Sequence, residues 1–348
     1  MKEKLLKQIE YLSDKYENEK DFFFHVRNLI YESDIQSSFT RETKSFENLF
    51  LESLNNIEGK TQTQHLINTG FEKVDELIGG LSLGEYVVIG SRPSMGKTQL
   101  LINLSLHISQ NLPVFFYSYD HSDYLLMNRF ISTLTNISIQ KIHQKNLSND
   151  ELKEISLAKK DINKYKIFIN DSPDSSISAF KEQCLYQINN HDVKVIIVDY
   201  LQLMTSYRYR NHRESEVSNI SRELKKIARD NNVCVIVTSQ LSRAVEMRSG
   251  TKRPMLSDLR ESGAIEQDAD KVIFLHSPEN YGFIEDEEGN SLVNVIELMV
   301  AKNRNGKLGD VRLYKDHDFT TFKDAEAPVE DFTFSADRLK ELDDEAPF

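Results

Sequence analysis

Residues 90–98 have the sequence GSRPSMGKT, in which a lysine and a hydroxyl side chain follow a tight turn that contains glycine. Such a turn can surround an anion with backbone N–H groups, and the start of a following helix adds partial positive charge. Lys97 is suited to the terminal phosphates of a nucleotide, and the Thr98 hydroxyl is suited to Mg²⁺. The strict pattern has glycine five residues before Gly96, where this chain has Ser91, so a strand-to-helix turn without a ligand is the alternative.

A carboxylate follows a second apolar run, Lys194-Val-Ile-Ile-Val-Asp199. In P-loop ATPases, an aspartate at such a strand end holds the magnesium shell. A strand that ends in aspartate is common alone, but both motifs in one chain favour a nucleotide site. The sequence therefore predicts ATP and Mg²⁺ as ligands, with Thr98 and Asp199 at the metal. The phosphates are expected to lie against Arg92, Pro93, Ser94, Met95, Gly96, Lys97 and Thr98.

The elements around these residues alternate between strand and helix. The run before the turn predicts a buried strand, and Leu100, Leu101, Leu104 and Ile108 recur at helical spacing after it. This alternation predicts an α/β fold with a mostly parallel sheet covered by helices. The last two or three strands lack helical spacers and are expected to be antiparallel additions. The predicted strands are 86–90, 113–118, 166–170, 194–199, 233–238, 271–275, 293–300 and 310–315.

The chain is predicted to have three regions. Residues 1–64 form a short helical region, in which residues 45–57 (SFENLFLESLNNI) have a broad apolar face that needs a partner surface. Residues 65–324 form the α/β domain. Residues 325–348 are acidic and contain proline, which predicts a disordered tail. The acidic run at 285–288, followed by Gly289 and Asn290, predicts a solvated hairpin tip.

Composition restricts the class of protein. No stretch of the 348 residues approaches the roughly 18 apolar residues of a membrane span, and the charged N-terminus has no signal-peptide core. Two cysteines without paired spacing argue against a disulfide framework, so a cytoplasmic protein without a membrane partner is expected. The net charge of −12 argues against nucleic acid at first sight. Much of it lies in the tail, however, so basic loops on the rest of the surface remain compatible with binding DNA.

These motifs in this order resemble the C-terminal motor domain of DnaB-type replicative helicases, within the RecA-like P-loop ATPases. The resemblance implies a ring-shaped homo-hexamer that hydrolyses ATP and moves along single-stranded DNA, in the 5′ to 3′ direction. The block DLRESGAIEQDAD is the most specific part of the match. The matching stretches are INTGFEKVDELIGGL (67–81), SRPSMGKT (91–98), VDYLQLM (198–204), TSQLSR (238–243), RPMLSDLRESGAIEQDAD (253–270) and AKNRNGKLG (301–309).

The resemblance also assigns roles at the nucleotide. Gln240 ends an apolar strand, and the family implies that it senses the γ-phosphate; alternatively it only terminates the strand. Lys302 and Arg304 share one face if the strand continues. The family implies that they reach the ATP site of the neighbouring subunit as an arginine finger and its companion. Two solvated surface cations are the alternative.

Two loops are candidates for contact with DNA. The family places Arg260, Glu261 and Gly263 in the channel of the ring, where arginine pairs with phosphate and glycine allows close backbone approach. In residues 206–213, Arg208 and Arg210 alternate with tyrosines, which suits phosphate contact and base stacking. A flexible solvated loop is the alternative interpretation of the second segment.

The chain departs from the family at the residue that activates the attacking water. The family has glutamate there, and this chain has Asp120, whose side chain is one methylene shorter. Asp120 can still accept a proton, although its reach is reduced. His121 is the alternative base.

The second departure is the short region before the motor. DnaB-type helicases carry a helical domain of roughly a hundred residues and a linker helix, and residues 45–57 fit only the linker. This short region argues against the main replicative helicase of a cell. A helicase of a mobile element, a phage or a defence system suits a shortened chain, and the sequence does not choose among them. One alternative to a helicase is a DNA-binding ring with weak hydrolysis that acts as scaffold or loader. Another is a recombinase of the RecA type or a signalling ATPase with a similar core, against which DLRESGAIEQDAD followed by KNRNG argues.

The chain ends in Asp343-Asp-Glu-Ala-Pro-Phe348. This end resembles the tips of bacterial single-stranded-DNA-binding proteins, which dock on partner proteins. A protein partner for the tip is therefore one expectation, and a solubilising tail is the other.

Overall fold

The computed structural model describes residues 2–16, 18–19, 21–23, 25–26, 29, 44–58, 66–209, 212–259, 263–316 and 320–325. The chain separates into two compact units, residues 1–64 and residues 65–348. No helix in the described ranges combines the length and the apolar character that crossing a bilayer requires.

The first unit contains α1 (Lys2–Lys15) and α3 (Phe46–Ile57), in agreement with the helix predicted at 45–57. The Ser45 hydroxyl accepts a hydrogen bond from the Asn48 backbone N–H at 3.2 Å, which satisfies one of the free donors at the start of α3. Lys44 and Glu52 form an exposed ion pair across the first turns. The apolar side chains of α3 are solvent-exposed: Phe46, Leu49, Phe50, Leu51, Leu54 and Ile57.

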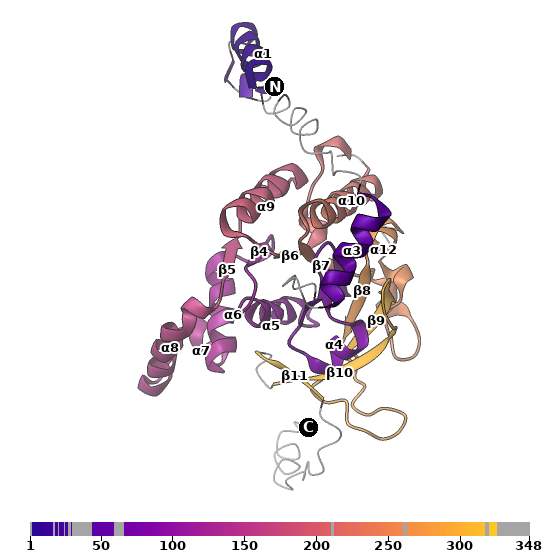
Figure 1. Ribbon diagram of the computed structural model, residues 1–348. Helices are drawn as coiled ribbons and strands as arrows, with labels where there is room; N and C mark the ends of the chain where they lie inside the picture. Colours follow the sequence, from indigo (N-terminus) through magenta and orange to yellow (C-terminus); the bar gives the residue numbers. More distant parts are fainter. Residues whose placement is uncertain are drawn as a thin grey trace. The chain divides into compact units, whose positions relative to one another are not determined.

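The second unit is built on a sheet whose strands, in the described part of the chain, follow the order β11-β10-β9-β8-β3-β7-β6-β4-β5 (Figure 1). The strands from β8 to β5 are parallel, whereas β9, β10 and β11 are antiparallel additions, as the sequence predicts. The bounds are β3 (Tyr86–Ser91), β4 (Val114–Ser118), β5 (Ile167–Asn170), β6 (Val195–Asp199), β7 (Cys234–Gln240), β8 (Lys271–His276), β9 (Val295–Asn303), β10 (Gly309–Lys315) and β11 (Phe322–Asp324).

Helices cover both faces of this sheet, because side chains alternate along each strand. On β3, Val87 and Ile89 pack with α4, α5 and α6, whereas Tyr86 and Val88 pack with α9, α10 and α12. Figure 1 shows α9 and α10 on one side of the strands and α5 on the other. The helices are α4 (Glu72–Ile78), α5 (Lys97–Ile108), α6 (Asp123–Thr135), α7 (Ile139–Gln144), α8 (Asn149–Asp161), α9 (Ile177–His191), α10 (Arg213–Asn231), α11 (Ala244–Met247) and α12 (Gly263–Asp268).

The predicted α/β class is confirmed, and each predicted strand is present with ends shifted by a few residues at most. Sequence reasoning missed the short pair β1 (Leu66–Ile67) and β2 (Leu81–Ser82), and the edge strand β11. The hairpin tip is present, since Glu285 bridges to Ser291 and Asp286 accepts the Asn290 N–H at 2.8 Å. Residues 326–348 lie outside the described residues, so the disordered tail stays a prediction.

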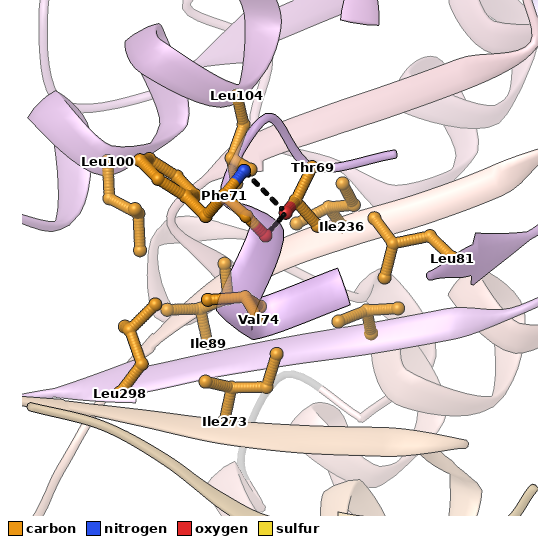
Figure 2. A pocket seen from close by; sticks show the side chains of 11 residues that line it. Thr69, Phe71, Val74, Leu81, Ile89, Leu100, Leu104, Ile236, Ile273 and Leu298 are labelled. Atoms are coloured by element: carbon orange, nitrogen blue, oxygen red, sulfur yellow. Dashed lines mark hydrogen bonds between the residues drawn. The ribbon is translucent and has the colours of Figure 1, made fainter. Parts of the chain in front are cut away.

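The core beneath α4 contains a small apolar cavity of about 20 Å³ (Figure 2). Its one polar lining residue, Thr69, is occupied, because its hydroxyl accepts the N–H of Phe71 at 3.2 Å. A water molecule needs two or more polar partners, so the cavity is expected to be dry. Leu104 of α5 and Val74 of α4 both line this space.

Leu104→Ala is expected to lower the free energy of unfolding by about 2–5 kcal/mol, because it enlarges a cavity that cannot be hydrated. Leu104 is 5% exposed, whereas Leu157 of α8 is 57% exposed. Leu157→Ala is therefore the matched control, with an expected change within about 0.5 kcal/mol. Urea unfolding followed by circular dichroism measures both. Equal losses in the two variants would contradict the proposed packing of the cavity.

Candidate functional site

The predicted phosphate loop connects β3 to α5 at the carboxyl edge of the parallel sheet. Ser94 and Gly96 have φ values of 63° and 92°, and Gly96 is the N-cap of α5. Left-handed residues within such a turn direct successive backbone N–H groups toward one point, which forms an anion-binding concavity. The loop thus has the geometry that its sequence predicts.

The Arg92 side chain is directed into the protein. Its Nε lies 2.8 Å from a carboxylate oxygen of Glu246 on α11, and its Nη1 donates to the Leu241 carbonyl at 2.6 Å. Met95 is also buried, and Asn280 donates to the Ser94 carbonyl at 3.2 Å. These contacts fix the shape of the loop, so Arg92 and Met95 can serve a ligand through the backbone, while Pro93 and Ser94 are exposed.

Lys97 is a partly buried cation at the start of α5. Burial lowers the pKa of its ammonium group, and the carboxylates of Asp199 and Asp120 act in the opposite direction. The ammonium lies 5.4 Å from the centre of the Tyr200 ring and forms no ion pair with any residue that the structure describes. A desolvated cation without a paired anion is what a phosphate group requires, so the residues present fit a nucleotide.

The two predicted metal residues are in direct contact. Thr98 Oγ1 donates to Asp199 Oδ2 at 2.6 Å, and Thr238 Oγ1 donates to Asp199 Oδ1 at 2.7 Å. Asp199 ends β6 and is buried. A hydroxyl and a carboxylate at this distance, beside the phosphate loop, are the oxygen ligands that Mg²⁺ prefers when it binds together with phosphates.

Gln240 lies at the carboxyl end of β7, in register with Ser91 at the end of β3. The side chain of Gln202 holds its backbone: Gln202 Oε1 accepts the Gln240 N–H at 3.0 Å, and Gln202 Nε2 donates to the Gln240 carbonyl at 3.0 Å. This pair of bonds fixes the backbone of Gln240 beside Ser91, the last residue of β3 before the phosphate loop.

Asp120 follows β4 by two residues, and Ser118 at the end of β4 is in register with Asp199. The Asp120 carboxylate is 51% exposed. Its negative charge acts to raise the pKa of both Lys97 and Tyr200. The residues predicted to contact the nucleotide thus lie at the carboxyl ends of four parallel strands, β3, β4, β6 and β7. Ligand sites in open α/β folds usually lie at these ends.

Lys302 and Arg304 lie at the amino ends of the parallel strands, opposite the phosphate loop. The Lys302 ammonium donates to the carbonyls of Glu266 and Gln267 at the end of α12, and Arg304 donates to the Gln267 carbonyl at 2.6 Å. Arg304 also lies 3.3 Å from Asp270. The antiparallel register of β9 against β8 places these cations near the amino end of β8, away from the phosphate loop of the same chain.

The predicted DNA contacts are mostly outside the described residues, namely Arg210, Arg260 and Glu261. Arg208 falls in a turn of 3₁₀ helix from Tyr207 to Tyr209, and Gly263 is the first residue of α12. The C-terminal tip also lies outside the described residues. The roles of these residues remain predictions.

The DnaB-like helicase C-terminal domain family matches residues 67–324 of the chain. The chain belongs to this family. A replicative DNA helicase named DnaC of Bacillus subtilis is 34% identical over 300 residues, which are 84% of this chain and 65% of that protein. Replicative DNA helicase DnaB of Rickettsia prowazekii is 35% identical over 284 residues, or 75% of this chain and 58% of that protein. The chain thus spans less than two thirds of these curated relatives.

Solved structures agree with this membership. The chain superposes with a TM-score of 0.78 on a DnaB-like replicative helicase that was studied for its interactions with primase, at 29% identity over 93% of this chain and 75% of that one. It superposes on a second solved structure, an isolated ATPase domain, with a TM-score of 0.73, at 32% identity over 82% of this chain and 100% of that one. The mostly parallel sheet is therefore that of the DnaB-type motor.

Sequence reasoning missed four residues that hold this DnaB-type site together: Tyr200, Gln202, Thr238 and Glu246. Gln202 and Thr238 fall within stretches that match the family, VDYLQLM and TSQLSR, but their partners are distant in sequence. The sequence signal that could have found such residues is a hydrogen-bonding side chain at or next to the carboxyl end of a predicted parallel strand.

Thr238→Val is expected to weaken the affinity for Mg²⁺ about 10–100-fold, because the hydroxyl that orients the Asp199 carboxylate is lost while the side-chain shape is kept. Titration of ATPase activity with Mg²⁺ at saturating ATP measures this shift. Thr133→Val on α6 is the control, since its hydroxyl contacts two backbone carbonyls and the side chain of Gln99, and not Asp199. An unchanged Mg²⁺ requirement in Thr238→Val would contradict the orienting role.

Proposed function

We propose that this chain is an ATP-hydrolysing DNA helicase motor that moves along single-stranded DNA as a ring-shaped homo-hexamer. The observation that carries the proposal is the joining of Lys97, Thr98 and Asp199 at one sheet edge within a DnaB-type motor domain. The direction of movement, 5′ to 3′, is proposed by similarity with the family.

Each residue at the edge has a defined part in hydrolysis. Lys97 and the backbone of the phosphate loop bind the β- and γ-phosphates. Thr98 and Asp199 would hold Mg²⁺, and the bound ion would supply positive charge beside the phosphates. Asp120 accepts a proton from the attacking water. The water oxygen bonds to the γ-phosphorus while the bond between that phosphorus and the β,γ-bridging oxygen breaks. Gln240 senses the presence of the γ-phosphate, as the family implies.

The positions of Lys302 and Arg304 support a site that two subunits share. The phosphate loop follows the carboxyl end of β3, and these cations lie near the amino end of its neighbour β8. β3 spans six residues, or about 20 Å, which is longer than an arginine side chain can reach. Arg304 therefore cannot stabilise phosphate in its own chain, so a catalytic role requires the neighbouring subunit.

Contact with DNA is proposed for the segment that leads into α12. Arg260→Ala is expected to weaken binding to oligo(dT) and to reduce the slope of log K against log [salt] by about 0.7, because one phosphate contact is lost from a single strand. Fluorescence anisotropy from low to moderate salt measures both values. Lys153→Ala on exposed α8 is the control of equal charge. A slope like that of the wild type would place the DNA elsewhere.

Strand displacement tests the function as a whole. The full chain is expected to unwind a forked DNA duplex with ATP and Mg²⁺, and Lys97→Ala is expected not to. The chain could instead hydrolyse ATP and bind DNA but displace no strand, whether the single-stranded tail of the substrate is 5′ or 3′. That result would favour a DNA-binding ring that acts as a scaffold or loader.

A further inference from the structure

Asp120 and His121 lie in a short connection that is fixed at both ends. On the strand side, the Tyr119 N–H donates to the Asp199 carbonyl at 2.7 Å, and the His121 N–H donates to Ser118 Oγ at 3.0 Å. On the helix side, Ser122 is the N-cap of α6, and its hydroxyl accepts the N–H of Leu125. The backbone of the two residues is thus held while their side chains are left to adjust.

The imidazole of His121 faces the Asp120 carboxylate. His121 Nδ1 lies 3.7 Å from Asp120 Oδ2, and the His121 side chain is 22% exposed. Nδ1 is buried and has no hydrogen-bond partner among the described residues. A buried polar atom without a partner is destabilising, so this nitrogen favours any arrangement in which it gains a partner.

A small movement of the carboxylate supplies that partner. A shift of about 1 Å closes the gap to the 2.7–2.9 Å of a charge-assisted hydrogen bond. Asp120 and His121 line a shallow cleft together with two further titratable residues, Tyr119 and Asp171. Asp171 Oδ2 accepts the Asp123 N–H at 3.0 Å. Asp120 is the expected acceptor for His121, because its Oδ2 already lies 3.7 Å from Nδ1.

We propose that His121 is a positioning residue for Asp120: its Nδ1–H holds Oδ2, so that Oδ1 faces the attacking water. The short aspartate is 51% exposed, and no hydrogen bond from the described residues orients its carboxylate toward the phosphate. A third group that orients the base is a general requirement of such sites, because misplacement by about 1 Å can cost about 10²-fold in rate. The inference rests on the proposed function, in which Asp120 is the base.

Variants of His121 separate the positioning role from its alternatives. His121→Leu keeps the size but removes the donor, so kcat for ATP is expected to fall about 10–10²-fold with KM for ATP unchanged. His121→Asn puts an amide N–H near the position of Nδ1 and is expected to lose no more than about threefold. His121→Gln, whose amide falls near the other ring nitrogen, is expected to behave like His121→Leu and remains informative if the leucine variant folds poorly.

The length of residue 120 gives an independent check. A glutamate reaches further, so in the Asp120→Glu background His121→Leu is expected to cost less than about threefold. The same loss in both backgrounds would overturn the proposal, as would wild-type kcat in His121→Leu.

A loss in His121→Asn as large as that in His121→Leu would identify His121 as the base itself, because an amide cannot accept a proton. Asp120→Asn tests separately whether Asp120 is the base. If that variant keeps the wild-type rate, the assignment of Asp120 in the proposed function fails, whatever the His121 variants show. Thermal unfolding and the affinity for ATP of each variant show whether the fold and the phosphate loop are retained.

Discussion

Lys97→Ala is expected to lower ATP turnover by at least about 10³-fold while the fold remains intact. The Lys97 ammonium forms no ion pair with the residues that the structure describes, and burial already lowers its pKa. Its removal therefore takes away no internal salt bridge and relieves desolvation. The loss falls on phosphate binding and on charge stabilisation during transfer.

The measurements for Lys97→Ala are steady-state hydrolysis, with and without single-stranded DNA, and thermal unfolding without nucleotide. Lys225→Ala is a contrasting control, because Lys225 of α10 pairs with Asp270 at the opposite sheet edge. That variant is expected to lose stability and to keep its phosphate loop. Turnover in Lys97→Ala equal to that of the wild type would remove the phosphate loop from the proposed function.

The strands, their alternation with helices and the residues of the phosphate loop could be predicted from the sequence. Parallel strands buried on both faces read as continuous apolar runs, so β6 and β7 are visible without any alignment. Gly96, Lys97 and Thr98 are adjacent in sequence, and their chemistry follows from local geometry. Asp199 can be recognised because it ends an apolar run.

The contacts that organise the site were less accessible to sequence reasoning. Thr238 bonds to a carboxylate 39 positions away, and Arg92 pairs with Glu246 across 154 positions. Neither residue is unusual in its local sequence, and only the order of β6, β7 and β3 in the sheet brings the partners together. The positioning role of His121 could likewise not be inferred from sequence, because it depends on the distance to Asp120 and on the burial of Nδ1.

The cations Lys302 and Arg304 show the same limit. Their alternation predicted that they share one side, and both donate to the carbonyl oxygen of Gln267. Their contact with the end of α12 was not predicted, because the acceptors are backbone carbonyls and any sequence offers those. The contact is favourable because cations near the C-terminal end of a helix satisfy its free carbonyl groups.

Arg304→Ala is expected to lower ATP turnover by about 10³–10⁵-fold, as does loss of an arginine finger in phosphoryl transfer. In one chain, Arg304 is bound to Gln267 and Asp270, at the edge of the sheet that lies away from its own phosphate loop. Binding of ATP by Arg304→Ala is expected to persist, because every residue that holds the phosphates is unchanged. Hydrolysis and nucleotide affinity, measured on the same assembled protein, separate these effects.

Mixing variants decides whether the site is shared. Arg304→Ala chains keep the phosphate loop, and Lys97→Ala chains keep the arginine, so a mixed ring contains some interfaces with both intact groups. Mixtures are therefore expected to regain part of the turnover that each variant alone lacks, with a maximum at an intermediate ratio. Subunit exchange is verified by energy transfer between labelled chains. If exchanged rings show no recovery at any ratio, Arg304 does not act across the interface, and its contact with α12 in its own chain is its principal role.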